Sequence, residues 1–129
     1  MFGPHLMLDC YGCNRKKLED IKFVYNFLDR FADDIGMHKI MPPYAFSYCG
    51  TKPEDWGVSG IILIAESHIS VHTFPEKGFV SIDLFSCKEF DVKRAIKYAL
   101  SEFEAERYES NFLMRGREFP KDIAKAAQI

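Results

Sequence analysis

The sequence has 129 residues, a length that fits one domain with a hydrophobic core of its own. Hydrophobic residues make up 47%, charged residues 28%, and the net charge is −2, which excludes a strongly basic nucleic-acid-binding surface. No stretch reaches the ~18 apolar residues of a membrane helix, and MFGPHLMLDCYG lacks the regions of a secretory signal. We therefore expect a cytoplasmic protein without nucleic-acid or membrane partners.

Four cysteines and many aromatic residues stand out in the composition. In a reducing cytoplasm, Cys10, Cys13, Cys49 and Cys87 are expected as free thiols. The single Cys10-x-x-Cys13 pair has no second ligand cluster and does not open a helix, so we expect no metal site and no redox motif there. The 12 Phe and 6 Tyr fit a well-filled core, although some rings are also candidates for a pocket or a subunit interface.

The first part of the chain predicts a strand followed by a helix. Residues 5–11 are predicted as the strand. Residues 15–35 are predicted as an amphipathic helix that begins at the N-cap Asn14 and ends at Gly36. Its apolar residues recur at helical spacing: Leu18, Ile21, Val24, Leu28 and Phe31.

The middle of the chain predicts extended structure. Residues 37–49 are interrupted by Pro42–Pro43, which favours an edge strand or a bend. Residues 50–57 have the composition of a loop. Residues 58–65 (VSGIILIA) are the strongest strand signal in the sequence.

The last part predicts two more strands, a helix and a final strand. Residues 68–74 and 79–87 are predicted as strands joined by a turn at 75–78, residues 91–104 as an amphipathic helix, and residues 106–114 as the last strand. This order predicts an α+β fold, a two-layer sandwich with helices on one face of a mainly antiparallel sheet.

The spacing of two serines within residues 58–67 predicts that their side chains lie on the same face of a strand. Ser59 and Ser67 are eight residues apart, so on a straight strand they point the same way. That face also carries Ile61, Leu63 and Ala65, and we expect it to be buried. A serine on a buried face needs a hydrogen-bond partner or a function.

Taken singly, a strand serine, a histidine beside a strand and a cysteine at a strand end are ordinary structural residues. Their combined spacing is informative. The string AESHISVHTFPEKGFVSIDLFSC, preceded by GVSG, closely resembles the core motif of the prokaryotic S-adenosylmethionine decarboxylase family. The opening GPHLMLDCYGC and the pair His38-Lys39 resemble further motifs of this family. The resemblance covers roughly residues 3–90.

The resemblance implies a proenzyme, with residues 1–129 forming one decarboxylase domain that cleaves itself into 1–66 and 67–129. Ser67 would attack the carbonyl of Glu66 and convert the amide into an ester. Ser59 and His72 would assist, and an imidazole can remove the Cα proton of Ser67. Elimination then leaves dehydroalanine, which hydrolyses to a covalent pyruvoyl group.

The resemblance also implies the roles of other residues. The pyruvoyl group would form a Schiff base with the amine of a small-molecule substrate and act as an electron sink during decarboxylation. Cys87 would return a proton to the substrate. Glu76 would bind the ribose hydroxyls, unless it is a solvated turn residue. Asp9 replaces a glutamate common in the family and suits a cationic substrate. The product would be the aminopropyl donor for spermidine synthesis.

The segment before GVSG departs from the family pattern. Many members carry a short string such as HKFSPQGVSG, whose phenylalanine stacks on adenine, whereas this chain has the longer HKIMPPYAFSYCGTKPEDWGVSG. Four aromatic residues are candidates for that role: Tyr44, Phe46, Tyr48 and Trp56. The change is either a lengthened loop or a remodelled pocket. L-arginine and L-ornithine therefore remain alternative substrates, and a non-catalytic binding protein of the same fold is an alternative of another class.

The resemblance further implies a homodimer in which two sheets pack face to face with the helices outside, an αββα arrangement. Within residues 79–87, Phe79 and Phe85 share the face opposite the aliphatic residues. This pattern is consistent with a second buried sheet surface. Alternatively, the face packs under the loop of residues 40–57.

Overall fold

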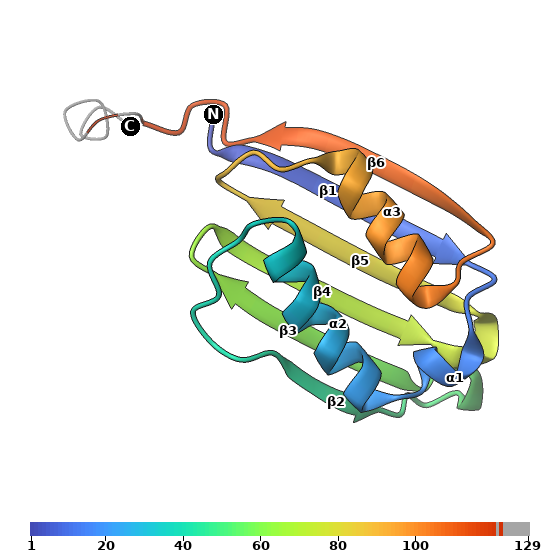
Figure 1. Ribbon diagram of the computed structural model, residues 1–129. Coiled ribbons are helices and arrows are strands. Elements are labelled where there is room, and N and C mark those ends of the chain that lie inside the picture. The colour runs from blue at the N-terminus through green and yellow to red at the C-terminus, as the bar shows by residue number, and fades with distance from the viewer. Residues whose placement is uncertain (121, 123–129) are drawn as a thin grey trace.

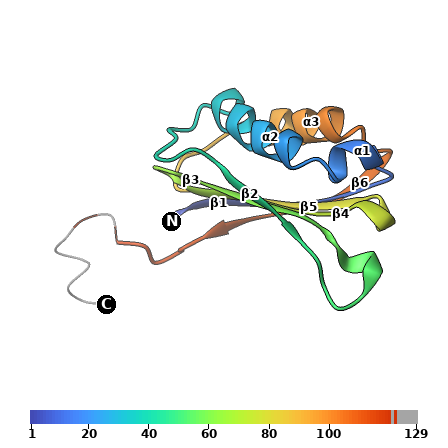
Figure 2. The ribbon, with the colours of Figure 1, turned by 90° about the horizontal axis from the view of Figure 1, so that it is seen from below.

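A computed structural model describes residues 1–120 and residue 122 (Figure 1). In chain order the elements are β1 (Gly3–Tyr11), α1 (Arg15–Leu18), α2 (Ile21–Asp34), β2 (Tyr44–Tyr48), η1 (Pro53–Asp55), β3 (Gly57–Ile64), β4 (Ser67–Phe74), η2 (Pro75–Lys77), β5 (Phe79–Ser86), α3 (Val92–Phe103) and β6 (Arg107–Arg115). The six strands form one antiparallel sheet in the order β2-β3-β4-β5-β1-β6. The three α-helices lie on the same side of this sheet (Figure 2). The predicted α+β class and the helices on one face are confirmed.

The hydrophobic core lies between the sheet and helices α2 and α3. Alternate residues of β5 contribute to it, because Val80, Ile82 and Leu84 are at most 3% exposed. This confirms the alternation expected for that strand. On the helix side, Phe27 and Phe103 are buried and pack edge to face at 4.8 Å between ring centroids. Phe27, Phe31 and Phe103 therefore belong to the core, whereas other rings, such as those of Phe46 and Tyr48, are exposed.

The single helix predicted over residues 15–35 is wrong, because the structure has two helices with a break between α1 and α2. Asp20 adopts extended backbone angles, φ −98° and ψ 106°, and its carboxylate accepts hydrogen bonds from the N–H groups of Lys22 and Phe23. An aspartate in this arrangement caps a new helix. The predicted N-cap Asn14 is confirmed for α1.

The predicted common buried face of Ser59 and Ser67 is also wrong. Strand β3 ends at Ile64, the chain reverses, and Ser67 is the first residue of β4. Moreover, Ile61 is 38% exposed and Leu63 is 41% exposed, since they lie on the side of the sheet opposite the helices. We call this side the open face. Its side chains come from the strand positions that alternate with the core positions.

Gly3 allows β1 to approach the end of β5 closely. A methyl group at this position would lie 1.9 Å from the carbonyl oxygen of Ser86 and 2.7 Å from the Cα of Cys87. These are backbone atoms, so a larger residue would displace the strand that leads to Cys87.

We predict that Gly3→Ala lowers the free energy of unfolding by about 1–3 kcal/mol, because the added methyl overpacks two backbones. Thermal unfolding followed by circular dichroism would show a melting temperature lower by about 5 °C or more. Gly50→Ala is the matched control, since its methyl would come no closer than 3.3 Å to any neighbouring atom, the nearest being the Cβ of Asp55. Equal melting temperatures for the two variants would contradict this prediction.

Candidate active site

The peptide between Glu66 and Ser67 lies at the turn from β3 to β4, beside the end of β5. Ser67 is the register partner of Ser86. The backbone N–H of Cys87 donates a hydrogen bond to the carbonyl oxygen of Glu66 at 2.9 Å. A donor in this position stabilises negative charge that develops on the oxygen during an attack on the carbonyl carbon. The structure thus brings Glu66, Ser67 and Cys87 together.

The hydroxyl of Ser67 lies 3.1 Å from Nδ1 of His68, a contact that the sequence reasoning missed although His68 belongs to the quoted motif. Burial is the main reason that the pKa of His68 lies below its ordinary value, and the charges of His5 and Arg115 lower it further. The carboxylate of Asp83 acts in the opposite direction. The imidazole of His68 is therefore neutral at neutral pH.

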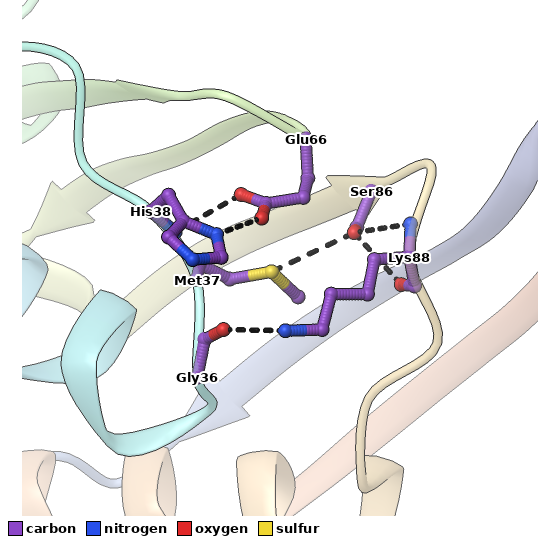
Figure 3. Close-up of polar contacts among 6 residues, drawn as sticks. All are labelled: Gly36, Met37, His38, Glu66, Ser86 and Lys88. Carbon is purple, nitrogen blue, oxygen red and sulfur yellow. Dashed lines mark hydrogen bonds and ion pairs between the residues drawn. The ribbon is translucent and has the colours of Figure 1, made fainter.

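The side chain of Glu66 is held by His38 (Figure 3). The carboxylate accepts a hydrogen bond from the backbone N–H of His38 at 3.0 Å and lies 2.6 Å from Nδ1 of its ring. Burial alone would raise the pKa of Glu66, but these hydrogen bonds outweigh it and hold the pKa below its ordinary value. Glu66 is only 7% exposed, so the residue before the predicted cleavage point is charged and fixed.

The loop that carries His38 is in turn tied to the end of β5 (Figure 3). The Lys88 ammonium donates to the carbonyl of Gly36 at 2.8 Å. The Ser86 hydroxyl donates to the carbonyl of Lys88 at 2.8 Å and lies 3.6 Å from the sulfur of Met37. Gly36 has a φ of 76°, which favours glycine, and this angle turns the chain after α2 toward the site.

Ser59 and His72 form a second pair at another place on the sheet. They are register partners on β3 and β4, and the Ser59 hydroxyl lies 3.0 Å from Nδ1 of His72. His72 is five residues along β4 from Ser67, which corresponds to about 16 Å in an extended strand. The structure therefore brings Ser59 and His72 together, but within one chain it separates them from Ser67.

The strand register arranges the open face in rows, because cross-strand partners share a face. The Ser59–His72 row consists of Phe46, Ser59, His72, Ser81, Asp9 and Glu109. The His68 row consists of Leu63, His68, Phe85, His5 and Leu113. The predicted substrate-binding residue Asp9 thus lies in the row of His72, two strands away. Burial and the charges of Glu109 and Asp83 raise its pKa.

Glu76 lies in η2, at the end of β4 remote from Ser67. Its Oε1 accepts hydrogen bonds from the Arg15 guanidinium at 2.6 Å and from the Trp56 indole at 3.2 Å. Both hydrogen bonds lower the pKa of Glu76, and the bond from Trp56 has the larger effect. Trp56, one of the four aromatic candidates, is therefore bonded to Glu76.

A pocket of about 310 Å³ opens beside the pair of Ser59 and His72. Its aromatic walls come from Phe46, Tyr48 and Phe74. Two of the four aromatic candidates, Phe46 and Tyr48, therefore line a pocket that contains predicted site residues. A larger pocket, about 640 Å³, lies over α3 and β6 and contains none of the predicted site residues.

The cysteines differ in their surroundings. Cys87 is exposed at the end of β5, whereas Cys10 and Cys13 are buried. Burial raises the pKa of Cys10 to about 12 and that of Cys13 to about 11, so both remain protonated thiols. All four are free, as predicted. Within residues 1–120 and 122, no group of three or more His, Cys, Asp or Glu side chains could hold a metal ion.

None of the helices in the described part of the chain has the length and apolar character needed to cross a bilayer.

Comparison with known proteins decides the family. Residues 4–116 match the profile described as S-adenosylmethionine decarboxylase. The chain belongs to the S-adenosylmethionine decarboxylase family. The family predicted from the sequence motifs is therefore confirmed.

Relatives and a solved structure agree with this assignment. The chain is 33% identical to the S-adenosylmethionine decarboxylase proenzyme of Geobacillus sp. (strain WCH70), covering 98% of this chain and 97% of the relative. It is 35% identical to the proenzyme of Pyrococcus furiosus, covering 90% and 80%. The crystal structure of the adenosylmethionine decarboxylase from Aquifex aeolicus VF5 superposes with a TM-score of 0.76 at 26% identity, covering 94% and 97%.

We predict that His38→Ala, made in the uncleaved Ser67→Ala chain, lowers the free energy of unfolding at neutral pH by about 1–2 kcal/mol, because a buried carboxylate loses a hydrogen bond. The pKa of Glu66 is lower in the folded chain than its ordinary value of 4.5. The loss is therefore full above that pH and shrinks as the pH falls through the folded pKa. Denaturant titrations at several pH values measure it.

Lys39→Ala is the control, because the ammonium of Lys39 makes surface ion pairs with Asp29 and Asp33 and does not contact Glu66. A loss in His38→Ala that did not change with pH, or that matched Lys39→Ala, would contradict the role given to Glu66.

Proposed function

We propose that this chain is the proenzyme of a pyruvoyl-dependent S-adenosylmethionine decarboxylase, which cleaves itself into residues 1–66 and 67–129. One observation carries the proposal: the carbonyl of Glu66 accepts a hydrogen bond from the N–H of Cys87 while the adjoining Ser67 hydroxyl contacts an imidazole. The names of the relatives support it and favour S-adenosylmethionine over L-arginine or L-ornithine. The product supplies aminopropyl groups for spermidine synthesis in the cytoplasm.

The cleavage begins when Oγ of Ser67 attacks the carbonyl carbon of Glu66. The N–H of Cys87 stabilises the oxyanion, and the peptide becomes an ester. Removal of the Cα proton of Ser67 then expels the Glu66 carboxylate and leaves dehydroalanine. Hydrolysis of dehydroalanine releases ammonia and gives the pyruvoyl group at residue 67.

The residues around Ser67 fit a group formed there. The pyruvoyl group supplies an electrophilic carbonyl that binds the substrate's amine covalently and withdraws electrons from the carbon that loses carbon dioxide. Cys87 follows the register partner of Ser67 and is exposed, so its thiol can return a proton to the substrate.

The role of His72 requires a second copy of the chain. His72 and Ser59 are about 16 Å along the strand from Ser67 and cannot reach it within one chain. In a homodimer with the open faces packed together, a two-fold axis running across the strands exchanges the Ser59–His72 row of one subunit with the His68 row of the other. Packed sheets lie about 10 Å apart, close enough for their side chains to meet.

The chemistry of the open face supports this dimer. Apolar side chains at least 38% exposed line one end of it: Tyr44, Phe46, Tyr48, Ile61 and Leu63. Apolar surface of this kind favours a partner. The alternative that the loop of residues 40–57 covers Phe85 is not supported, because the ring of Phe85 instead contacts those of Phe2, His5 and His68.

The pocket beside His72 is the proposed site for the nucleoside of the substrate. Phe46 and Tyr48 provide faces on which adenine can stack. Both hydrogen bonds to Glu76 engage its Oε1, which leaves Oε2 as an acceptor for a ribose hydroxyl. Asp9, in the row of His72, adds negative charge suited to a sulfonium substrate.

We predict that the wild-type chain gives two bands on a denaturing gel and that Ser67→Ala gives one full-length, inactive band. Phenylhydrazine should modify the 67–129 fragment of the wild type only, because it traps a ketone. Ser110→Ala, at an exposed strand serine, is the control and should cleave normally. Carbon dioxide release should be observed with S-adenosylmethionine. Release from arginine or ornithine alone would refute the substrate, and an intact wild-type chain would refute the cleavage.

We predict that inactive chains complement each other. Neither Ser67→Ala nor His72→Ala should cleave efficiently alone. In a heterodimer of the two, the His72→Ala chain should be cleaved, because its Ser67 meets His72 of the partner subunit. Different affinity tags allow the heterodimer to be purified and each chain to be followed on a gel. A His72→Ala chain that remains intact in that heterodimer would argue against the shared site.

A further inference from the structure

Two imidazole–serine pairs involve histidines of β4 that point to the open face, and they differ in their relation to the predicted cleavage point. Ser59–His72 lies at one end of β4, whereas Ser67–His68 includes the nucleophile itself. We infer that His68 is the base that takes the proton from Ser67 in the first step of self-cleavage. This inference rests on the self-cleavage proposed above and adds a catalytic residue to it.

The contact geometry supports this role. Nδ1 of His68 lies 3.1 Å from Oγ of Ser67, which is hydrogen-bond distance, and it accepts the hydroxyl proton when the ring carries its own proton on Nε2. The ring is held by Phe85, with 5.8 Å between centroids and 65° between planes. His38, the other histidine near the scissile peptide, has its Nδ1 engaged by Glu66.

The step is an isomerisation that balances without another reactant. The proton of Oγ moves to Nδ1 of His68 while Oγ bonds to the carbonyl carbon of Glu66, and the N–H of Cys87 donates to the oxyanion. The bond from that carbon to the nitrogen of Ser67 then breaks, and the nitrogen takes the proton back from His68. The products are an ester and a free amine on one unbroken chain.

The charged groups around His68 keep its ring in the neutral form that this step needs. His5 faces it from β1 and Arg115 from β6, and both favour the neutral ring. Asp83 on β5 favours the charged ring but is itself 3.1 Å from His5. On β3 the register partner is Leu63, which is apolar. The cleavage rate should therefore rise with pH and level off below the pH expected for an ordinary imidazole.

The inference separates the tasks of the two histidines, which gives a direct readout. His68 acts in ester formation within one chain, while His72 of the partner subunit acts in the later elimination. Hydroxylamine cleaves an ester but leaves a peptide intact. His72→Ala should therefore accumulate a chain that hydroxylamine cuts between Glu66 and Ser67, and a variant without the His68 base should not.

His68→Gln and His68→Ala are the test variants. Glutamine can still hydrogen-bond to Ser67 but cannot take its proton, so cleavage should slow by about 100-fold or more and no hydroxylamine-sensitive ester should accumulate. Added imidazole should restore cleavage of His68→Ala at least in part, through the space that the ring vacates. Ser110→Ala, at an exposed strand serine that does not contact His68 or Ser67, should cleave at close to the wild-type rate.

The outcomes distinguish the inference from the function it rests on. Wild-type chain that never cleaves would refute the proposed function. Wild-type cleavage together with His68→Gln cleavage within about threefold of it would overturn only the role of His68. The same conclusion follows if the His68 variants cleave slowly but accumulate the hydroxylamine-sensitive ester. It also follows if added imidazole does not restore cleavage of folded His68→Ala. If His68→Ala does not fold, as judged by its melting curve, the rate and ester content of His68→Gln decide.

Discussion

The site depends on one backbone hydrogen bond, from the N–H of Cys87 to the carbonyl oxygen of Glu66. A backbone donor is fixed by the sheet and does not vary with side-chain rotamers, so it is already in place for charge that appears on that oxygen. The same bond places the Cys87 thiol beside residue 67. A single contact between the β3–β4 turn and the end of β5 thus serves both the proposed cleavage and the proposed protonation of the substrate.

Residues remote in the sequence hold this contact in place. His38 and Glu66 are 28 residues apart, and their hydrogen bonds fix the turn that carries the carbonyl. At the end of β5, the ammonium of Lys88 donates a hydrogen bond to the carbonyl of Gly36 and so holds the loop that carries His38. Because Gly3 has no side chain, β1 can lie against the backbone of Ser86 and Cys87. Three separate segments therefore position the peptide between Glu66 and Ser67.

The sequence was informative where a pattern is local and failed where contacts are distant. Alternation in β5 and the cap at Asn14 follow from strand and helix periodicity, and both are observed. The break between the predicted strands 58–65 and 68–74 carries no glycine, proline or asparagine, so it was not recognised as a chain reversal and the shared face was misassigned. Asp20 fits the polar side of a continuous helix as well as a cap. The contact of His38 with Glu66 has no local signal at all.

The different tasks proposed for His68 and His72, four residues apart on one strand, follow from their different environments. His68 is partly buried among charged neighbours beside the nucleophile, while His72 is exposed at the pocket rim. Since both point to the open face, the proposed face-to-face dimer would bring His72 of one subunit close to His68 of the other across the interface. In this proposal, ester formation would need only one chain, whereas elimination would need two. Cleavage would thus be completed only after assembly, when the pocket that receives the substrate is also closed by the partner subunit.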